Sequence, residues 1–123
     1  MLYAILCYNS EEIVESWSKE ENDAVMARLD AVNQKLISQG RLGPTARLMP
    51  TTTAMTVRKG KQPLVTDGPF IETKEQLLGF YVVECKSLDE ALDVAKELSV
   101  ANAGVGGYEV RPLRMHLPLG FPS

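Results

Sequence analysis

The chain has little cysteine, a single histidine and no long hydrophobic run. Its cysteines, Cys7 and Cys85, both lie in apolar, strand-like segments, which favours two buried thiols over a disulfide and suits a reducing compartment. No apolar stretch approaches the roughly 20 residues of a membrane span, and the first residues lack the features of a signal peptide. We therefore expect a cytoplasmic protein with no membrane partner.

The chain also lacks a strong excess of either positive or negative charge. Thirteen Lys and Arg against 16 Asp and Glu give a net charge of -3, and no basic stripe indicates nucleic acid. No set of His, Cys and carboxylate residues has metal-ligand spacing. The glycine-rich stretch from Ala103 to Gly107 follows a predicted helix, whereas a phosphate-binding loop follows a strand and precedes a helix. We predict no metal and no cofactor.

What the chain does contain is the pattern of one mixed domain. At 123 residues and 45% hydrophobic content, it is long enough for a single core. The runs from Leu2 to Tyr8 and from Leu77 to Cys85 are almost continuously apolar, which is typical of central strands buried on both faces. Further strands are predicted at 43–49 and 52–58, in a hairpin through Lys59-Gly60-Lys61 into 62–66, and at 108–113, where Pro112 ends the strand or marks it as an edge.

Two helices are predicted from capping signals and apolar spacing. Ser18 and Glu21 form a capping box, and the helix that follows ends at Gly40. Ser87 and Glu90 form a second box before a shorter helix. The apolar stripes that the two helices should bury are Val25, Leu29, Val32 and Leu36 in the first, and Leu88, Ala91, Leu92, Ala95 and Leu98 in the second.

The order of these elements predicts an α+β fold of the ferredoxin-like βαββαβ type, with an extra hairpin and one domain over residues 1–123. The tail from 116 to 123 is expected to be loose. Helices in this plan cover one face of an antiparallel sheet, yet both central strands are apolar on both faces. A second copy of the same sheet is the simplest cover, so we predict a homodimer packed sheet to sheet.

The segment from Val65 to Glu75 combines turn chemistry with charge. Asp67, Gly68 and Pro69 predict a tight turn, because glycine reaches unusual backbone angles and proline fixes its own. Asp67 at a rigid turn could serve as a general base facing a cleft, or its carboxylate could bond its own turn. Phe70 is expected to anchor this loop in the core, and the alternative is that it forms a pocket wall.

Arginines on predicted strands are the candidate ligand-binding residues. A guanidinium on a strand either pairs with a carboxylate, such as Glu84 or Glu109, or faces a wet cleft. Its planar fork suits the carboxylate or phosphate of a small anionic ligand. The candidate ligand-binding residues are Arg47, Arg58, Tyr81 and Arg111, the tyrosine because its hydroxyl could enter the cleft.

Segments spread over nearly the whole chain carry a resemblance to a known family: Tyr3 to Tyr8, Thr53 to Arg58, Val65 to Leu77, Gly79 to Tyr81, Leu88 to Ala91 and Glu109 to Pro112. They resemble the YCII-related proteins of the DGPF group, in the dimeric α/β barrel superfamily. The resemblance implies a ferredoxin-like protomer that dimerises through its sheet, with a cleft between the sheets for a small molecule.

The same resemblance bears on activity and partners. Some relatives in the wider family are thought to act as enzymes through a His and Asp pair, but the single histidine here is His116, in the tail. Members of the DGPF group are often encoded beside alternative sigma factors, which suggests a regulatory protein as a partner.

We therefore expect a homodimeric YCII-related protein that binds a small molecule in a cleft between sheets. One alternative is a cofactor-free enzyme of lyase, isomerase or dechlorinase-like type, with Asp67 as the base and an arginine steadying an anionic substrate. The other is a protein-interaction module in sigma-factor-linked regulation.

Overall fold

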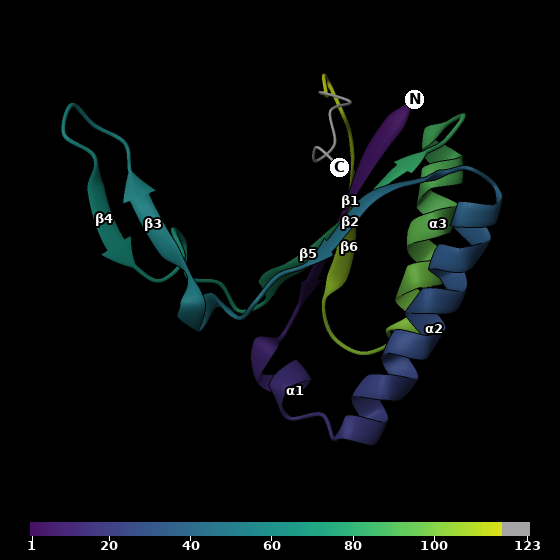
Figure 1. Ribbon diagram of the computed structural model, residues 1–123, viewed down its shortest axis with the longest axis horizontal. Helices are drawn as coiled ribbons and strands as arrows, with labels where there is room; N and C mark the ends of the chain where they lie inside the picture. The colour runs from purple at the N-terminus through teal and green to yellow at the C-terminus, as the bar shows by residue number, and fades with distance from the viewer. Residues whose placement is uncertain (117–123) are drawn as a thin grey trace, which may run out of the picture.

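The structure, a computed structural model, describes residues 1–116 (Figure 1). All of the expected loose tail except His116 lies outside the described residues. The elements in chain order are β1 (Leu2–Asn9), α1 (Glu11–Glu15), α2 (Lys19–Ser38), β2 (Leu42–Arg47), the 3-10 helix η1 (Thr51–Thr53), β3 (Met55–Arg58), β4 (Leu64–Asp67), β5 (Gln76–Glu84), α3 (Leu88–Ala101) and β6 (Gly107–Pro112).

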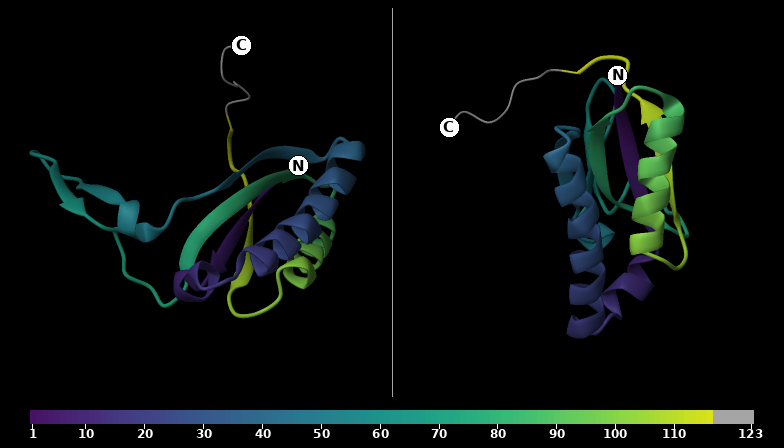
Figure 2. Two further views of the ribbon diagram at one scale, coloured as in Figure 1. Left: turned by 60° about the horizontal axis from the view of Figure 1, so that its bottom comes forward. Right: turned by 90° about the vertical axis from the view of Figure 1, so that its right-hand side faces the viewer.

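The main sheet has the order β2-β5-β1-β6, and every neighbouring pair is antiparallel. This is the strand order of a ferredoxin-like fold, and the two runs predicted as central strands, β1 and β5, lie in the middle. Helices α2 and α3 pack on the same face of the sheet (Figure 2). The predicted α+β fold with helices on one face is confirmed, and the sheet of the single chain is open.

The core fills the space between this face and the two helices. Alternate residues of the central strands point toward the helices, so that Tyr3 pairs with Val83 on the buried side and both are almost inaccessible. Of the stripe predicted for α2, Val25, Leu29 and Leu36 are buried as expected and Val32 is partly buried. The largest fully buried side chains are Ile5, Leu36, Leu98, Val83 and Cys85.

Both helices begin at the predicted serines. Ser18 Oγ accepts from the Glu21 N–H at 3.1 Å, and Glu21 accepts from the Ser18 N–H at 3.3 Å, which completes the capping box. Ser87 Oγ likewise accepts from the Glu90 N–H at 3.2 Å. The Glu90 carboxylate instead pairs with Arg41 at 2.8 Å, so it is drawn away from the return bond that a second box requires.

The predicted stripe of α3 is confirmed at Ala91, Ala95 and Leu98 and wrong at Leu88 and Leu92. Leu88 and Leu92 are 50% and 38% exposed, whereas Val94 and Ala101 are buried. The buried face of α3 is therefore centred on Ala91, Val94, Ala95, Leu98 and Ala101. Its small side chains allow the helix to lie close to the sheet, which leaves the two leucines on the outer side.

Residues 51–75, which we call the arm, leave the main sheet (Figure 1). The predicted hairpin is confirmed, because β3 pairs with β4 from Met55 opposite Asp67 to Arg58 opposite Leu64. The predicted tight connection at Pro50 between two consecutive strands is wrong, since η1 intervenes and β3 joins only β4. We call residues 1–50 and 76–116 the body.

Phe70 does not reach the core. Its side chain is 62% exposed, and the Arg58 guanidinium lies 5.2 Å from the centre of its ring, an arrangement that favours a cation–π contact. The prediction of core packing is wrong because the arm carries the loop away from the body. Cys7 and Cys85 are both free thiols, as expected, but only Cys85 is buried, and Cys7 is half-buried. Within residues 1–116, no helix has the length and apolar content needed to cross a bilayer.

Candidate functional site

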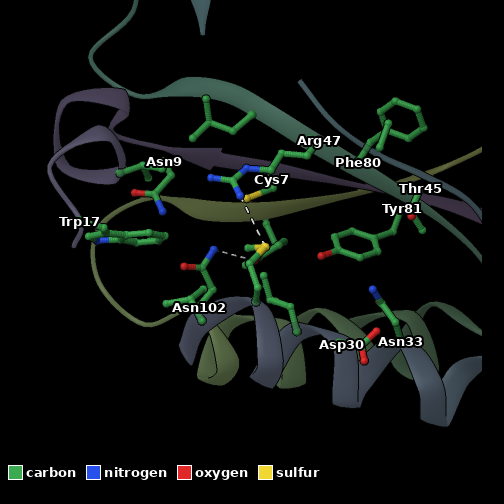
Figure 3. A pocket seen from close by; sticks show the side chains of 18 residues that line it. Cys7, Asn9, Trp17, Asp30, Asn33, Thr45, Arg47, Phe80, Tyr81 and Asn102 are labelled. Carbon is green, nitrogen blue, oxygen red and sulfur yellow. Dashed lines mark hydrogen bonds between the residues drawn. The ribbon is translucent and has the colours of Figure 1, made fainter. Parts of the chain in front are cut away.

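A cavity of about 450 Å³ lies between the helix-covered face of the sheet and α2 (Figure 3). Its volume falls in the range of small-molecule sites, which are concave, mostly apolar and furnished with a few polar groups. Its walls are Cys7, Asn9, Val14, Trp17, Val25, Met26, Leu29, Asp30, Asn33, Thr45, Ala46, Arg47, Leu78, Gly79, Phe80, Tyr81, Asn102 and Tyr108.

The floor of the cavity is formed by residues that strand pairing brings side by side. Cys7 of β1 lies opposite Gly79 of β5 on one side and Tyr108 of β6 on the other. Gly79 has to be glycine here, because a Cβ would stand 2.6 Å from the Ala46 carbonyl oxygen of β2. Its missing side chain also leaves room above the sheet beside the Cys7 thiol.

The opposite wall comes from one face of α2. Met26, Leu29 and Asn33 recur at helical spacing, so their side chains lie in a row toward the sheet. Figure 3 shows the Asn33 amide directed toward the Tyr81 ring across the cavity. Asn33 is thus a polar residue within a row that is otherwise apolar.

Arg47, at the end of β2, is the cation of the cavity. Its guanidinium Nη1 lies 3.5 Å from Asn22 Oδ1 and 3.4 Å from Met26 Sδ. In the part of the chain that the structure describes, Arg47 forms no ion pair with a carboxylate. Its planar fork of donors is therefore available to an anion.

The hydroxyls and the thiol in the cavity stay neutral. Burial raises the pKa of the Cys7 thiol, outweighing the neighbouring Tyr108 hydroxyl and the Arg47 guanidinium, which lower it. Burial likewise raises the pKa values of Tyr81 and Tyr108. A neutral thiol is a poor nucleophile, whereas a neutral phenol can donate a hydrogen bond. The cavity therefore offers donors rather than a reactive thiolate.

Two amide oxygens in the cavity wall have no donor. Asn33 Oδ1 and Asn102 Oδ1 are both buried, and no described residue hydrogen-bonds to either of them. The other end of the Asn102 amide is used, because Nδ2 donates to the Tyr108 hydroxyl at 3.0 Å. An unsatisfied buried acceptor costs about 1–3 kcal/mol, so a donor supplied by a ligand would be favourable.

Asp67 lies away from this cavity, at the end of β4 in the arm, where it is exposed. Gly68 adopts a φ of 89°, as the predicted turn requires. The turn is held by the Gly68 N–H, which donates to the Ala54 carbonyl at 2.8 Å, and by Thr56 Oγ1, which donates to the Gly68 carbonyl at 2.7 Å. Among residues 1–116 nothing hydrogen-bonds to the Asp67 carboxylate, and its role as a base stays a prediction.

The candidate ligand-binding residues lie in three different places: the cavity, the arm and strand β6. The structure brings Arg47 and Tyr81 together in the cavity. Arg58 lies in the arm against Phe70, and Arg111 lies on β6, where it is 71% exposed and 3.7 Å from the Glu109 carboxylate. Glu109 is on the same strand, so Arg111 pairs along β6 rather than across the sheet.

Sequence reasoning missed most of the polar lining of the cavity. Asn33 had a usable signal, because it follows Leu29 by four residues and so extends the apolar stripe of α2 with an amide. Cys7, Tyr108 and Asn102 had none, since their proximity depends on the pairing of β1 with β6. The cleft predicted between two sheets requires a second copy and stays a prediction, whereas this cavity lies on the helix-covered face.

The other charged groups of the described residues form no metal site. No group of three or more His, Cys, Asp or Glu residues within 1–116 is arranged to hold a metal ion. His116 is exposed at the end of the described chain and lines none of the cavities found there.

Comparison with known proteins gives the family and the fold. The model of the YCII-related domain family matches residues 1–115. An uncharacterized protein from Rhizobium meliloti is 57% identical over 124 residues, which cover 100% of both chains. Among solved structures, the 5-chloro-2-hydroxyhydroquinone dehydrochlorinase from Burkholderia phenoliruptrix, in complex with 2,5-dihydroxybenzoquinone, matches with a TM-score of 0.52 and 15% identity, covering 94% of this chain and 96% of that one. At this identity the likeness is one of fold.

Proposed function

The chain belongs to the YCII-related family, and we propose that it binds a small anionic ring compound in the cavity between its sheet and α2. The family match and the relative from Rhizobium meliloti identify the domain, but they indicate no activity. The observation that carries the proposal is the cavity itself, of about 450 Å³, with apolar walls and an arginine that has no carboxylate partner among the described residues.

The shape of the ligand follows from the apolar walls. Trp17, Val25 and Leu29 line the side of the cavity away from the sheet, and Tyr81 presents an aromatic ring on the other side. Flat hydrophobic and aromatic surfaces favour a ring, which buries apolar area and can stack on an aromatic side chain. A compound of one substituted ring fits a cavity of this volume.

The charge and the hydroxyls of the ligand follow from the polar groups. Arg47 suits a carboxylate or an ionised ring hydroxyl, and the neutral Tyr81 hydroxyl can donate to the same oxygen. Asn33 Oδ1 and Asn102 Oδ1 require donors, which the hydroxyls of a ligand supply. The ring compound in the structure of the dehydrochlorinase, 2,5-dihydroxybenzoquinone, has acidic hydroxyls of this kind.

We further propose that the protein is a homodimer. On the face of the sheet without helices, Leu6, Phe80 and Val82 of the two central strands are only partly buried. An isologous pair would cover each such face with its copy. The alternative in which Asp67 acts as a base receives no support from a single chain, because the arm holds Asp67 outside the cavity.

Calorimetric titration with 2,5-dihydroxybenzoate tests the ligand proposal. We expect saturable binding by the wild-type protein, and about a tenfold or greater loss of affinity in Arg47→Ala, because a charge-assisted hydrogen bond contributes about 1.5–3 kcal/mol. Arg111→Ala is the matched comparison, since it removes the same side chain from the other face of the sheet and should leave the affinity unchanged.

Two results would contradict the proposal. One is the absence of binding to the wild-type protein across a panel of mono- and dihydroxybenzoates. The other is an equal loss in Arg111→Ala and Arg47→Ala, because binding would then follow overall charge and not the cavity.

A further inference from the structure

One face of the arm is uncovered and is apolar except for Asp67 at its end. The register of β3 with β4 sets Met55 opposite Asp67 and Val57 opposite Val65, so these side chains point to the same side of the ribbon. Met55, Val57 and Val65 are 60%, 62% and 58% exposed. We call these three side chains the apolar arm face.

A ribbon of this kind is poorly suited to stand alone in water. An isolated two-stranded hairpin is marginally stable at best, and exposed apolar strands near an open edge promote association. The body offers β3 and β4 no cover, because they form a separate two-stranded sheet that projects from it (Figure 1). The apolar arm face therefore needs a surface from another molecule.

Hydrogen bonds to Glu11 fix the orientation of the base of the arm. The Glu11 carboxylate of α1 accepts from the Thr51 N–H and from Thr51 Oγ1, both at 2.6 Å. The Glu11 N–H donates to Gln76 Oε1 at 3.0 Å, on the strand by which the chain returns. Glu11 of the body thus bonds the first residue of the arm and the residue that directly follows the arm, which lowers the entropy lost when the arm docks.

The tip of the arm has the opposite charge to the rest of the chain. Residues 55–66 contain Arg58, Lys59 and Lys61 and no acidic residue, which gives this segment a charge of about +3. Because the whole chain carries -3, the remainder carries about -6. The tip of one copy and the remainder of a second copy therefore carry net charges of opposite sign, and complementary charge favours docking.

The arm is also continuous with one side of the main sheet. It begins after β2 and ends at β5, the strands at one side of the main sheet. A two-fold assembly could therefore cover the sheet face and the apolar arm face together.

We propose that the arm docks on a second copy of this chain, with the apolar arm face against that copy and the basic tip toward its net-acidic remainder. This contact adds to the pairing of sheets and does not depend on what the cavity binds. Each protomer contributes one arm, so a dimer contains the contact twice.

Sedimentation equilibrium of the full chain tests the contact with isosteric substitutions. We compare the wild-type protein with Val57→Thr/Val65→Thr, since threonine keeps the β-branched shape and the strand preference while adding a hydroxyl to the buried surface. We expect the dimer dissociation constant to rise about tenfold or more. Val100→Thr is the control, because Val100 lies on α3 and is 79% exposed; it should leave the constant unchanged.

A charge reversal in the turn tests the same contact without altering either strand. Lys59→Glu/Lys61→Glu should weaken the dimer at low salt, and the difference from the wild-type protein should shrink as salt screens the charges. A wild-type protein that is monomeric at micromolar concentration would overturn the proposal. So would a dimer whose dissociation constant is unchanged in both arm variants, because the sheets alone would then hold it.

Discussion

The body and the arm use the same residue types in opposite ways. Leu98 and Val83 in the body have 0% exposure, whereas Leu64 and Val65 in the arm are 60% and 58% exposed. The difference arises because β1 and β5 lie under a layer of helices and β3 and β4 have no layer above them. The body therefore has the core that a chain needs to fold by itself, whereas the arm exposes the apolar side chains for which we propose a contact with a second copy.

Truncating a leucine in each region should give the largest contrast. Leu98→Ala removes a fully buried side chain and should lower the free energy of unfolding by about 2–5 kcal/mol. Leu64→Ala should change it by about 0.5 kcal/mol or less, because an exposed side chain loses little packing. Urea unfolding at a protein concentration where the chain is monomeric measures both values. Equal losses would mean that the arm is part of the same core.

A smaller difference between the body and the arm is expected in how their stability depends on alkaline pH. Burial raises the pKa of Cys7 above its ordinary value of 9.0 and those of Tyr81 and Tyr108 above 10.0. In the unfolded chain these groups ionise near the ordinary values, so the stability that they contribute is complete below about pH 9 and is lost as the pH rises toward the folded values. All the cysteines and tyrosines lie in the body, so the arm should not share this dependence.

Urea unfolding between pH 7 and pH 11 checks this expectation. Tyr108→Phe should flatten the decline, because phenylalanine has no hydroxyl to ionise in either state. A decline as steep as that of the wild-type protein would mean that Tyr108 titrates alike in the folded and unfolded chains.

The sequence was sufficient to predict the body because its signals are local or periodic. Continuous apolar runs indicated β1 and β5, and Ser18 with Glu21 indicated the start of α2. The buried face of α3 was predicted only in part, because the large side chains Leu88 and Leu92 suggested a stripe that included them, whereas the buried face includes Val94 and Ala101 instead. The short helix α1 was missed because an Asn-Ser-Glu-Glu sequence predicts a break as readily as a helix start.

The site was harder to predict than the fold. Asp67 attracted attention because Asp-Gly-Pro is strong turn chemistry, but a turn signal reports backbone conformation and not the location of a cavity. Arg47 and Tyr81 were identified because polar groups on strands need a partner or a wet space. The neighbours that complete the cavity, Cys7 and Tyr108, meet only through strand pairing, which no local pattern specifies.

Methyl resonances of methionine offer the most direct test of the claim that the cavity of the body is the ligand site. Met26 lies in the cavity wall, whereas Met55 lies on the arm and is 60% exposed. During titration of methyl-labelled protein with 2,5-dihydroxybenzoate, we predict that the Met26 resonance moves with occupancy and that the Met55 resonance stays in place. Movement of Met55 with Met26 unchanged would contradict the account, because the ligand would then bind at the arm and not in the cavity.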